Sequence, residues 1–176
     1  MFMFFCECTM NVVEKFCGGV NAAGLQRRMY ATCEDQITTI AAPAADTHTV
    51  ATITMRASAA CPPAVTAGIF YEWHFSPRDQ DYKSTRNEDT GEWNTEVKIF
   101  VPKREDEKSY LFNGLTGDNN IFIVEDKNAK KVIVGELNNG ASVGVIEQTN
   151  PMNGYVITIK WTSSHSPYFY SGSVTV

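Results

Sequence analysis

Positive charge is scarce in this sequence. Of its 176 residues, 15 are Lys or Arg and 20 are Asp or Glu, so the formal net charge is -5. Proteins that bind nucleic acid concentrate basic residues, so this balance argues against a chain that grips phosphate. It is compatible with a surface past which nucleic acid slides without adhering.

Long hydrophobic runs are also missing. No stretch approaches the roughly 18 apolar residues of a membrane-spanning helix, so we expect no membrane contact. The apolar start of MFMFFCECTM stops at Cys6 and has no basic residue before it, so we do not expect a secretory signal peptide. The five cysteines are an odd number in a chain of this size, which favours free thiols made in a reducing cytoplasm.

The patterns that accompany common chemistries are absent as well. There is no G-x-S-x-G elbow, and the glycine-rich CGGVNAAG lacks the Lys-Ser/Thr ending of a phosphate loop. Cys6 and Cys8 could offer two thiolates, but the three histidines show no pairing that would complete a metal site. Period two places Glu72 and His74 on one strand face without a second positioned carboxylate. We therefore expect neither an enzyme nor any metal or other cofactor.

What the chain does have is period-two alternation. The runs QITTIAA, THTVATITMRA, AGIFYEWHF and NTEVKIFV are rich in β-branched and aromatic residues, and a meander of similar runs fills the last third. The stretch REDEKSYLFNGLTG predicts the one helix, with Leu111 and Leu115 four apart and Gly117 at its end. The sequence predicts an all-β fold of nine or ten strands with one short flanking helix, a sandwich or barrel. We expect an N-terminal arm over residues 1–22 and a single domain over residues 23–176.

One long ribbon is unusual among these strands. Residues 78–93, RDQDYKSTRNEDTGEW, contain no Val, Ile, Leu, Phe or Met, and half of them are charged. The N-E-D-T-G segment is typical of a turn, so residues 78–101 are predicted to form one long polar hairpin. Its charges could simply protect a sheet edge from aggregation, or the hairpin could dock on another copy of the chain. For the second alternative the candidate contact residues are Arg78, Asp79, Asp81, Lys83, Arg86, Glu88, Asp89 and Glu92.

The order of these features resembles the tail tube proteins of tailed bacteriophages, particularly phages that infect Bacteroidota. Three stretches carry the resemblance: CGGVNAAGLQRRMYATCEDQITTI, VPKREDEKSYLFNGLTGDNNIFIVEDKNAKKVIVGEL and GYVITIKWTSSHSPYFYSG. They are a glycine-rich arm that enters the first strand, a strand end followed by a short helix and a hairpin, and a closing strand with an aromatic tail. The resemblance extends from about Phe16 to Gly172, and MFMFFCECTM has no counterpart in it.

The resemblance implies a virion structural protein made in the host cytoplasm. In such proteins a sandwich or barrel with a flanking helix assembles into rings of six, and the rings stack into a tube through which DNA is ejected. The expected partners are further copies of the chain, other tail proteins and DNA in transit. The tube wall is expected to be electronegative, with arms and loops joining the rings. On this basis the candidates for residues that face the channel are Thr85, Thr95, Glu96 and Lys98.

Two other functions remain open at this stage. A tail terminator or connector subunit of the same general fold would form a single ring that does not stack. An adhesin-like or carbohydrate-binding β sandwich could use Trp73, Trp93 and Trp161 to stack on sugars. An exposed coplanar pair of these tryptophans would favour the sugar-binding alternative.

Overall fold

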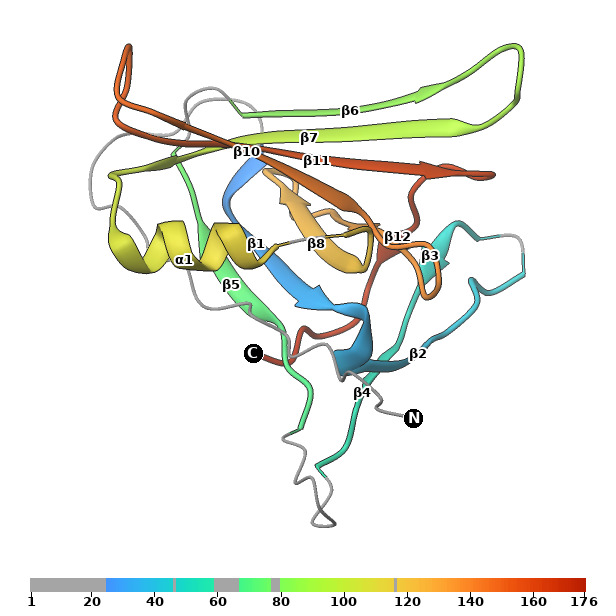
Figure 1. The fold of residues 1–176 in the computed structure, drawn as a ribbon. Coiled ribbons are helices and arrows are strands. Elements are labelled where there is room, and N and C mark those ends of the chain that lie inside the picture. Colours follow the sequence, from blue (N-terminus) through green and yellow to red (C-terminus); the bar gives the residue numbers. More distant parts are fainter. Residues whose placement is uncertain (1–24, 46, 59–66, 77–79, 116) are drawn as a thin grey trace, which may run out of the picture.

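The computed structural model describes residues 25–45, 47–58, 67–76, 80–115 and 117–176, and its strands form three sheets. The six-stranded sheet has the order β3-β12-β9-β8-β1-β5, and the four-stranded sheet has the order β10-β11-β7-β6. A short sheet of β2 and β4 completes the set (Figure 1). The predicted N-terminal arm lies outside the described residues.

The strands of each sheet have the following bounds. The six-stranded sheet consists of β1 (Leu25–Cys33), β3 (Thr49–Val50), β5 (Tyr71–His74), β8 (Asn120–Asp126), β9 (Lys131–Val134) and β12 (Phe169–Tyr170). The four-stranded sheet consists of β6 (Asp81–Arg86), β7 (Trp93–Pro102), β10 (Ser142–Gln148) and β11 (Gly154–Ser163). The remaining elements are η1 (Glu34–Gln36), β2 (Ile37–Ile40), β4 (Ile53–Met55) and α1 (Asp106–Gly114).

The six-stranded sheet is covered on both faces. One face packs on the four-stranded sheet and α1 around Trp73, Phe122 and Ile157, which are fully buried. The other face packs Ile121 and Ile123 against β2, β4 and the C-terminal segment. Because both faces of β8 are covered, its run NIFIV is apolar at successive positions instead of alternating.

The four-stranded sheet, in contrast, has one face on the core and one face in solvent. Along β7, Thr95, Val97 and Ile99 are buried, whereas Asn94, Glu96 and Lys98, which alternate with them, are exposed. This alternation is the pattern of a half-buried strand, and it ends at Phe100, which is also buried. As far as Lys98, it leaves one broad sheet face free of any covering layer among the described residues.

The prediction of an all-β fold with one short helix is confirmed. The described residues form twelve strands rather than nine or ten, in part because the single run THTVATITMRA contains two strands, β3 and β4. The helix is shorter than the predicted stretch: it ends at Gly114, and Gly117 lies beyond it with φ +82°. Leu111, Phe112 and Leu115 are buried, as their spacing indicated.

Candidate assembly surface

The free face of the four-stranded sheet is the most extensive polar surface that the fold leaves open, and we call it the outer face. Strand register places its side chains in rows across all four strands. The outer face comprises Asp81, Lys83, Thr85, Asn94, Glu96, Lys98, Ser142, Gly144, Ile146, Val156, Thr158, Lys160 and Thr162. Most of these are exposed, and Ile146 is the one large apolar side chain among them that is mostly in solvent.

Charges of opposite sign are interleaved on the outer face. Lys83 lies opposite Glu96, and Lys98 lies opposite Asp81. The Lys160 Nζ is 3.8 Å from a Glu96 carboxylate oxygen. Each of the three lysines therefore has an acidic neighbour on the adjacent strand, an arrangement that stabilises strand pairs. The face carries both signs and is not by itself electronegative, in contrast to the wall that the resemblance implies.

The charged ribbon forms the predicted hairpin. Strands β6 and β7 pair antiparallel from Asp81 opposite Lys98 to Arg86 opposite Trp93. At the tip, the Asn87 side-chain oxygen accepts a hydrogen bond of 2.9 Å from the backbone N–H of Asp89. Gly91 adopts φ +76° and donates its N–H to the Asn87 carbonyl at 2.9 Å. Turn residues thus close the hairpin at the point the sequence indicated.

The predicted contact residues occupy two parts of this hairpin. Asp81 and Lys83 lie on the outer face in β6, and the remaining described ones lie exposed at or beside the tip. These tip residues are Arg86, Glu88, Asp89 and Glu92. Arg78 and Asp79 lie outside the described residues. Exposure leaves all six described candidates available for contact, and whether they make contact stays a prediction.

Three of the four predicted channel-facing residues share the outer face. Thr85, Glu96 and Lys98 are exposed there. The placement of Thr95 with them is wrong: Thr95 is buried, and its hydroxyl lies 3.0 Å from that of Ser84 on the core side of the sheet. Successive residues of a strand point to opposite faces, so Thr95 could not share a face with Glu96.

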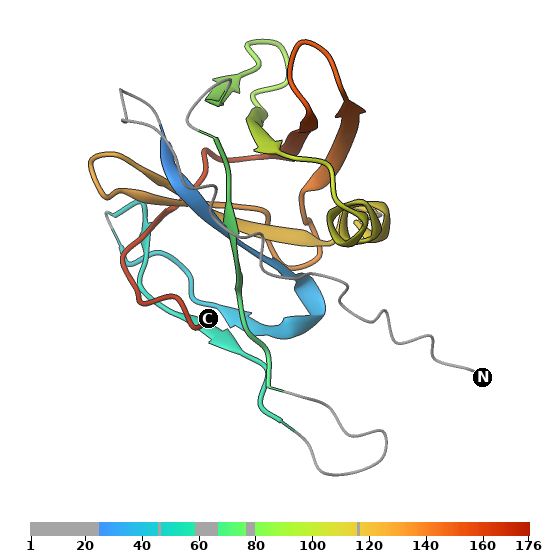
Figure 2. The same cartoon turned by 90° about the vertical axis from the view of Figure 1, so that its left-hand side faces the viewer.

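The four-stranded sheet ends in two strands that each have a neighbour on one side only, as far as the described residues go. These are β6 at one end and β10 at the other. All three strand pairs within the sheet are antiparallel, so β6 and β10 run in opposite directions. Figure 2 shows β6 (light green) and β10 (dark orange) at opposite ends of the sheet, with α1 on the β10 side.

The two ends of the sandwich differ in how well they are closed. On the β10 side, α1 packs Phe112 against Trp73 and Tyr155, with ring centroids 5.8 and 4.9 Å apart. The Ser109 and Tyr155 hydroxyls lie 2.6 Å apart and tie the helix to β11. On the β6 side no described helix covers the gap between the sheets, and a pocket of about 350 Å³ opens there.

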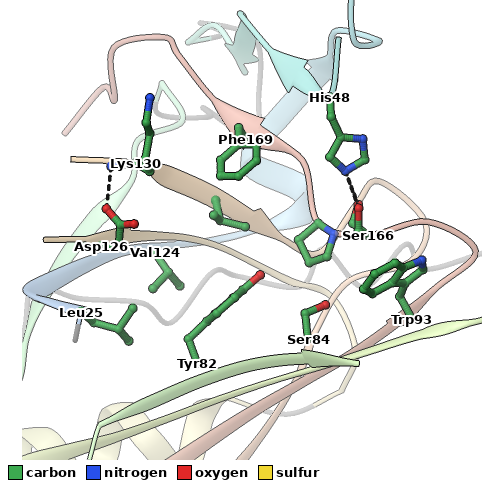
Figure 3. Close-up of a pocket in the computed structure, with 12 residues that line it drawn as sticks. Leu25, His48, Tyr82, Ser84, Trp93, Val124, Asp126, Lys130, Ser166 and Phe169 are labelled. Atoms are coloured by element: carbon green, nitrogen blue, oxygen red, sulfur yellow. Dashed lines mark hydrogen bonds between the residues drawn. The ribbon is translucent and has the colours of Figure 1, made fainter. Parts of the chain in front are cut away.

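We call this the side pocket, and its walls are largely apolar. It is lined by Leu25, His48, Tyr82, Ser84, Trp93, Val124, Asp126, Lys130, Val132, Ser166, Pro167 and Phe169. Figure 3 shows Tyr82 and Ser84 rising from β6 into the pocket, with Phe169 on the opposite wall. Burial raises the pKa of the Tyr82 hydroxyl, because a phenolate is poorly solvated there.

The rim of the side pocket holds a serine and a histidine in contact. The His48 Nε2 is 2.6 Å from the Ser166 hydroxyl and 3.0 Å from the Ser166 carbonyl oxygen (Figure 3). Both contacts are made by the same ring nitrogen, which donates in one tautomer of His48 and accepts in the other. The contact ties the loop before β12 to the residue that precedes β3.

Glu72 and His74, which the sequence placed on one strand face, take part in ion pairs on the six-stranded sheet. Arg28 lies 3.4 Å from Glu72 and 3.8 Å from Glu125, and the His74 Nε2 lies 3.9 Å from Glu72. Glu72 and His74 share a face, as period two indicated. No cluster of three or more His, Cys, Asp or Glu suited to a metal occurs among the described residues, while Cys6 and Cys8 lie outside them.

The positions of the cysteine and tryptophan residues test two further expectations, free thiols and an exposed pair of tryptophans. Cys33 is disulfide-bonded, so the interpretation of all five cysteines as free thiols is wrong for this residue. The other four cysteines lie outside the described residues. Trp73 and Trp161 are buried at 0% and 3% exposure and Trp93 is half-buried, so the three do not form an exposed coplanar pair.

Comparison with known proteins gives no relative. No family model matches the chain. No curated protein matches it. No solved structure matches it. Within the described residues, no helix has the length and apolar character needed to cross a membrane.

The side pocket and the β10 edge were not identified from the sequence. The pocket combines residues from β1, β6, β8 and the segments around β3 and β12, which are distant in sequence, so no local pattern marks it. The alternation of Val143 and Val145 in β10 did indicate a strand. It could not indicate that the strand ends a sheet, because edge position depends on which strands pair.

Proposed function

We propose that this chain is the ring-forming subunit of a phage tail tube, in which stacked rings form the channel for DNA ejection. The observation that carries the proposal is the four-stranded sheet with a free polar face and two oppositely directed end strands, each with an edge that no other described strand pairs with. A sheet of this kind is suited to continue from one copy of the chain into the next.

The directions of the end strands permit a head-to-tail contact between copies. If β10 of one copy lies beside β6 of another, the new pair is antiparallel, like every other pair in the sheet. The contact joins two different surfaces, so each copy keeps one surface of each kind free for the next neighbour. A rotation that closes produces a ring in which neither edge of the four-stranded sheet is left unpaired, which removes the aggregation hazard of those two edges.

The outer face is suited to line an aqueous channel for DNA. Its lysines would attract phosphate, but Glu96 and Asp81 lie beside them and reduce that attraction. Release of counterions by uncompensated Lys and Arg drives non-specific binding to DNA, so paired charges favour passage over retention. Polar outer-face residues such as Thr85, Asn94 and Thr162 add hydrated groups without net charge.

The alternatives differ in specific observables. A terminator or connector subunit would close the same kind of ring without stacking. A carbohydrate-binding sandwich would be a monomer that binds glycans, and the burial of Trp73 and Trp161 removes the aromatic pair on which that alternative depends.

Electron microscopy of the purified chain, with its mass in solution from light scattering, tests the proposal. We expect six-fold rings that stack into tubes with an open channel. Single rings that never stack would favour the terminator or connector alternative. A monomer at every soluble concentration that also binds glycans would overturn the proposal in favour of the sugar-binding alternative.

A further inference from the structure

We infer that the side pocket is the seat for a second copy of this chain, and that Val143 and Val145 of that copy's β10 close it. The inference rests on the proposed ring and deepens it, because it names the side chains that hold neighbouring subunits together. The pocket lies directly beside the edge of β6 that has no strand partner in the described part of the chain.

The core-facing side of β6 forms one wall of the pocket. Tyr82 and Ser84 point into it, as Figure 3 shows, and Trp93 stands at the end of the adjacent strand. A strand that pairs with β6 must place its own core-facing side chains at the mouth of the pocket, since side chains alternate between the two faces. An apolar pair at that position would remove the wall of the pocket from water.

Strand β10 presents such a pair. Val143 and Val145 face the core side of the sheet and pack against the core, yet each remains only partly buried. They lie at the opposite end of the same sheet, on the side that α1 closes (Figure 2). One end of the sandwich therefore carries partly exposed apolar side chains, and the other end carries an open apolar pocket.

Register within the sheet supports the match. Tyr82 lies opposite Val97, Val97 opposite Ile159, and Ile159 opposite Val143. Continuing this row into the next copy without a shift brings its Val143 opposite Tyr82. A shift by two residues brings Val145 there instead, whereas a shift by one would turn the valines away from the pocket.

Tryptophan fluorescence reports on the pocket separately from assembly. Trp73 and Trp161 are buried already, so quenching by acrylamide in the monomer comes mainly from the half-buried Trp93. On assembly we expect a severalfold fall in the quenching constant and a blue shift of the emission. Both changes should be absent in Trp93→Phe. Rings or tubes in which Trp93 stays as quenchable as in the monomer would overturn this inference and leave the proposed function standing.

A pair of variants adds a second readout. Val143→Ala combined with Val145→Ala should raise the concentration needed for assembly severalfold, while Ile146→Ala, on the same strand but on the outer face and 61% exposed, should not. Circular dichroism of the monomers establishes that each variant folds. Equal assembly of both variants would contradict the inference. A Trp93 that is shielded in the monomer and becomes quenchable when residues 1–24 are deleted would assign the pocket to that segment and overturn it as well.

Discussion

Removal of the Phe112 side chain tests whether α1 holds one end of the sandwich closed. Phe112 is 4% exposed and packs edge-to-face on Trp73 and Tyr155. Tyr110, two residues earlier in the same helix, is 77% exposed. Replacing each residue by Ala deletes an aromatic ring of similar size from the same helix. Comparing the stability of the two variants therefore separates the effect of burial from the effect of helix propensity.

The expected cost of Phe112→Ala is large. Deleting a buried phenylalanine ring leaves a cavity and costs about 3–5 kcal/mol of the free energy of unfolding. Loss of the two edge-to-face contacts favours the upper part of that range. For Tyr110→Ala the expected change is within about 0.5 kcal/mol, because an exposed side chain loses little on removal.

Urea denaturation followed by circular dichroism measures both changes. With a slope of about 2 kcal/mol per molar urea, Phe112→Ala should lower the midpoint by about 2 M, and Tyr110→Ala should leave it nearly unchanged. If the two variants unfold within about 1 kcal/mol of each other, α1 does not pack as described and the closure of the β10 side by the helix is refuted.

Two further changes probe the helix start and the outer face. Hydrogen bonds from Lys103 and Lys108 hold the pKa of Glu105 at about 2, below its ordinary 4.5. The stability that Glu105 contributes is therefore complete above pH 4.5 and is lost as the pH falls towards 2. Urea unfolding measured across that window should show a free energy that depends less on pH for Glu105→Gln than for wild type. Glu96→Lys leaves Lys83 and Lys160 without the acidic neighbour that they share, and we expect the assembled variant to retain double-stranded DNA at salt concentrations where wild type does not. The same charge change at the hairpin tip, Glu88→Lys, is the control, and equal retention by both variants would contradict a role of the outer face in DNA passage.

Local sequence patterns were enough to predict the parts of the fold that depend on short-range physics. The hairpin over β6 and β7 follows from a segment whose Asn and Gly tolerate the turn, placed directly before the alternating residues of β7. The helix follows from the spacing of Leu111 and Leu115. The two-residue period of a strand also determines which side chains share a face. Asn94 and Glu96, the neighbours of Thr95, lie on the face opposite to it, so the period alone excludes Thr95 from the outer face.

Features that depend on distant parts of the chain could not be predicted in this way. Whether β8 lies in the centre of a sheet and β10 at an edge is decided by pairings between segments far apart in sequence. The bonded state of Cys33 also depends on which residue the fold brings to it, and an odd count of cysteines does not reveal that. The side pocket combines both difficulties, because it requires the order of the strands and the packing of one sheet on another.

The two large sheets differ in how many of their faces are covered, and this difference explains why a long charged ribbon belongs in this chain. The six-stranded sheet packs apolar side chains against other elements on both of its faces, so it has no broad face left open among the described residues. The four-stranded sheet has one covered face, and the ribbon supplies one of its edge strands, a row of its outer face and the turn that ends it. If that edge pairs with the next copy, its core-facing residues must match an apolar neighbour while its outer-face residues must stay hydrated. Strand β6 meets both of these demands within its six residues. Tyr82 and Ser84 lie on its core side, and Asp81, Lys83 and Thr85 lie on its outer face.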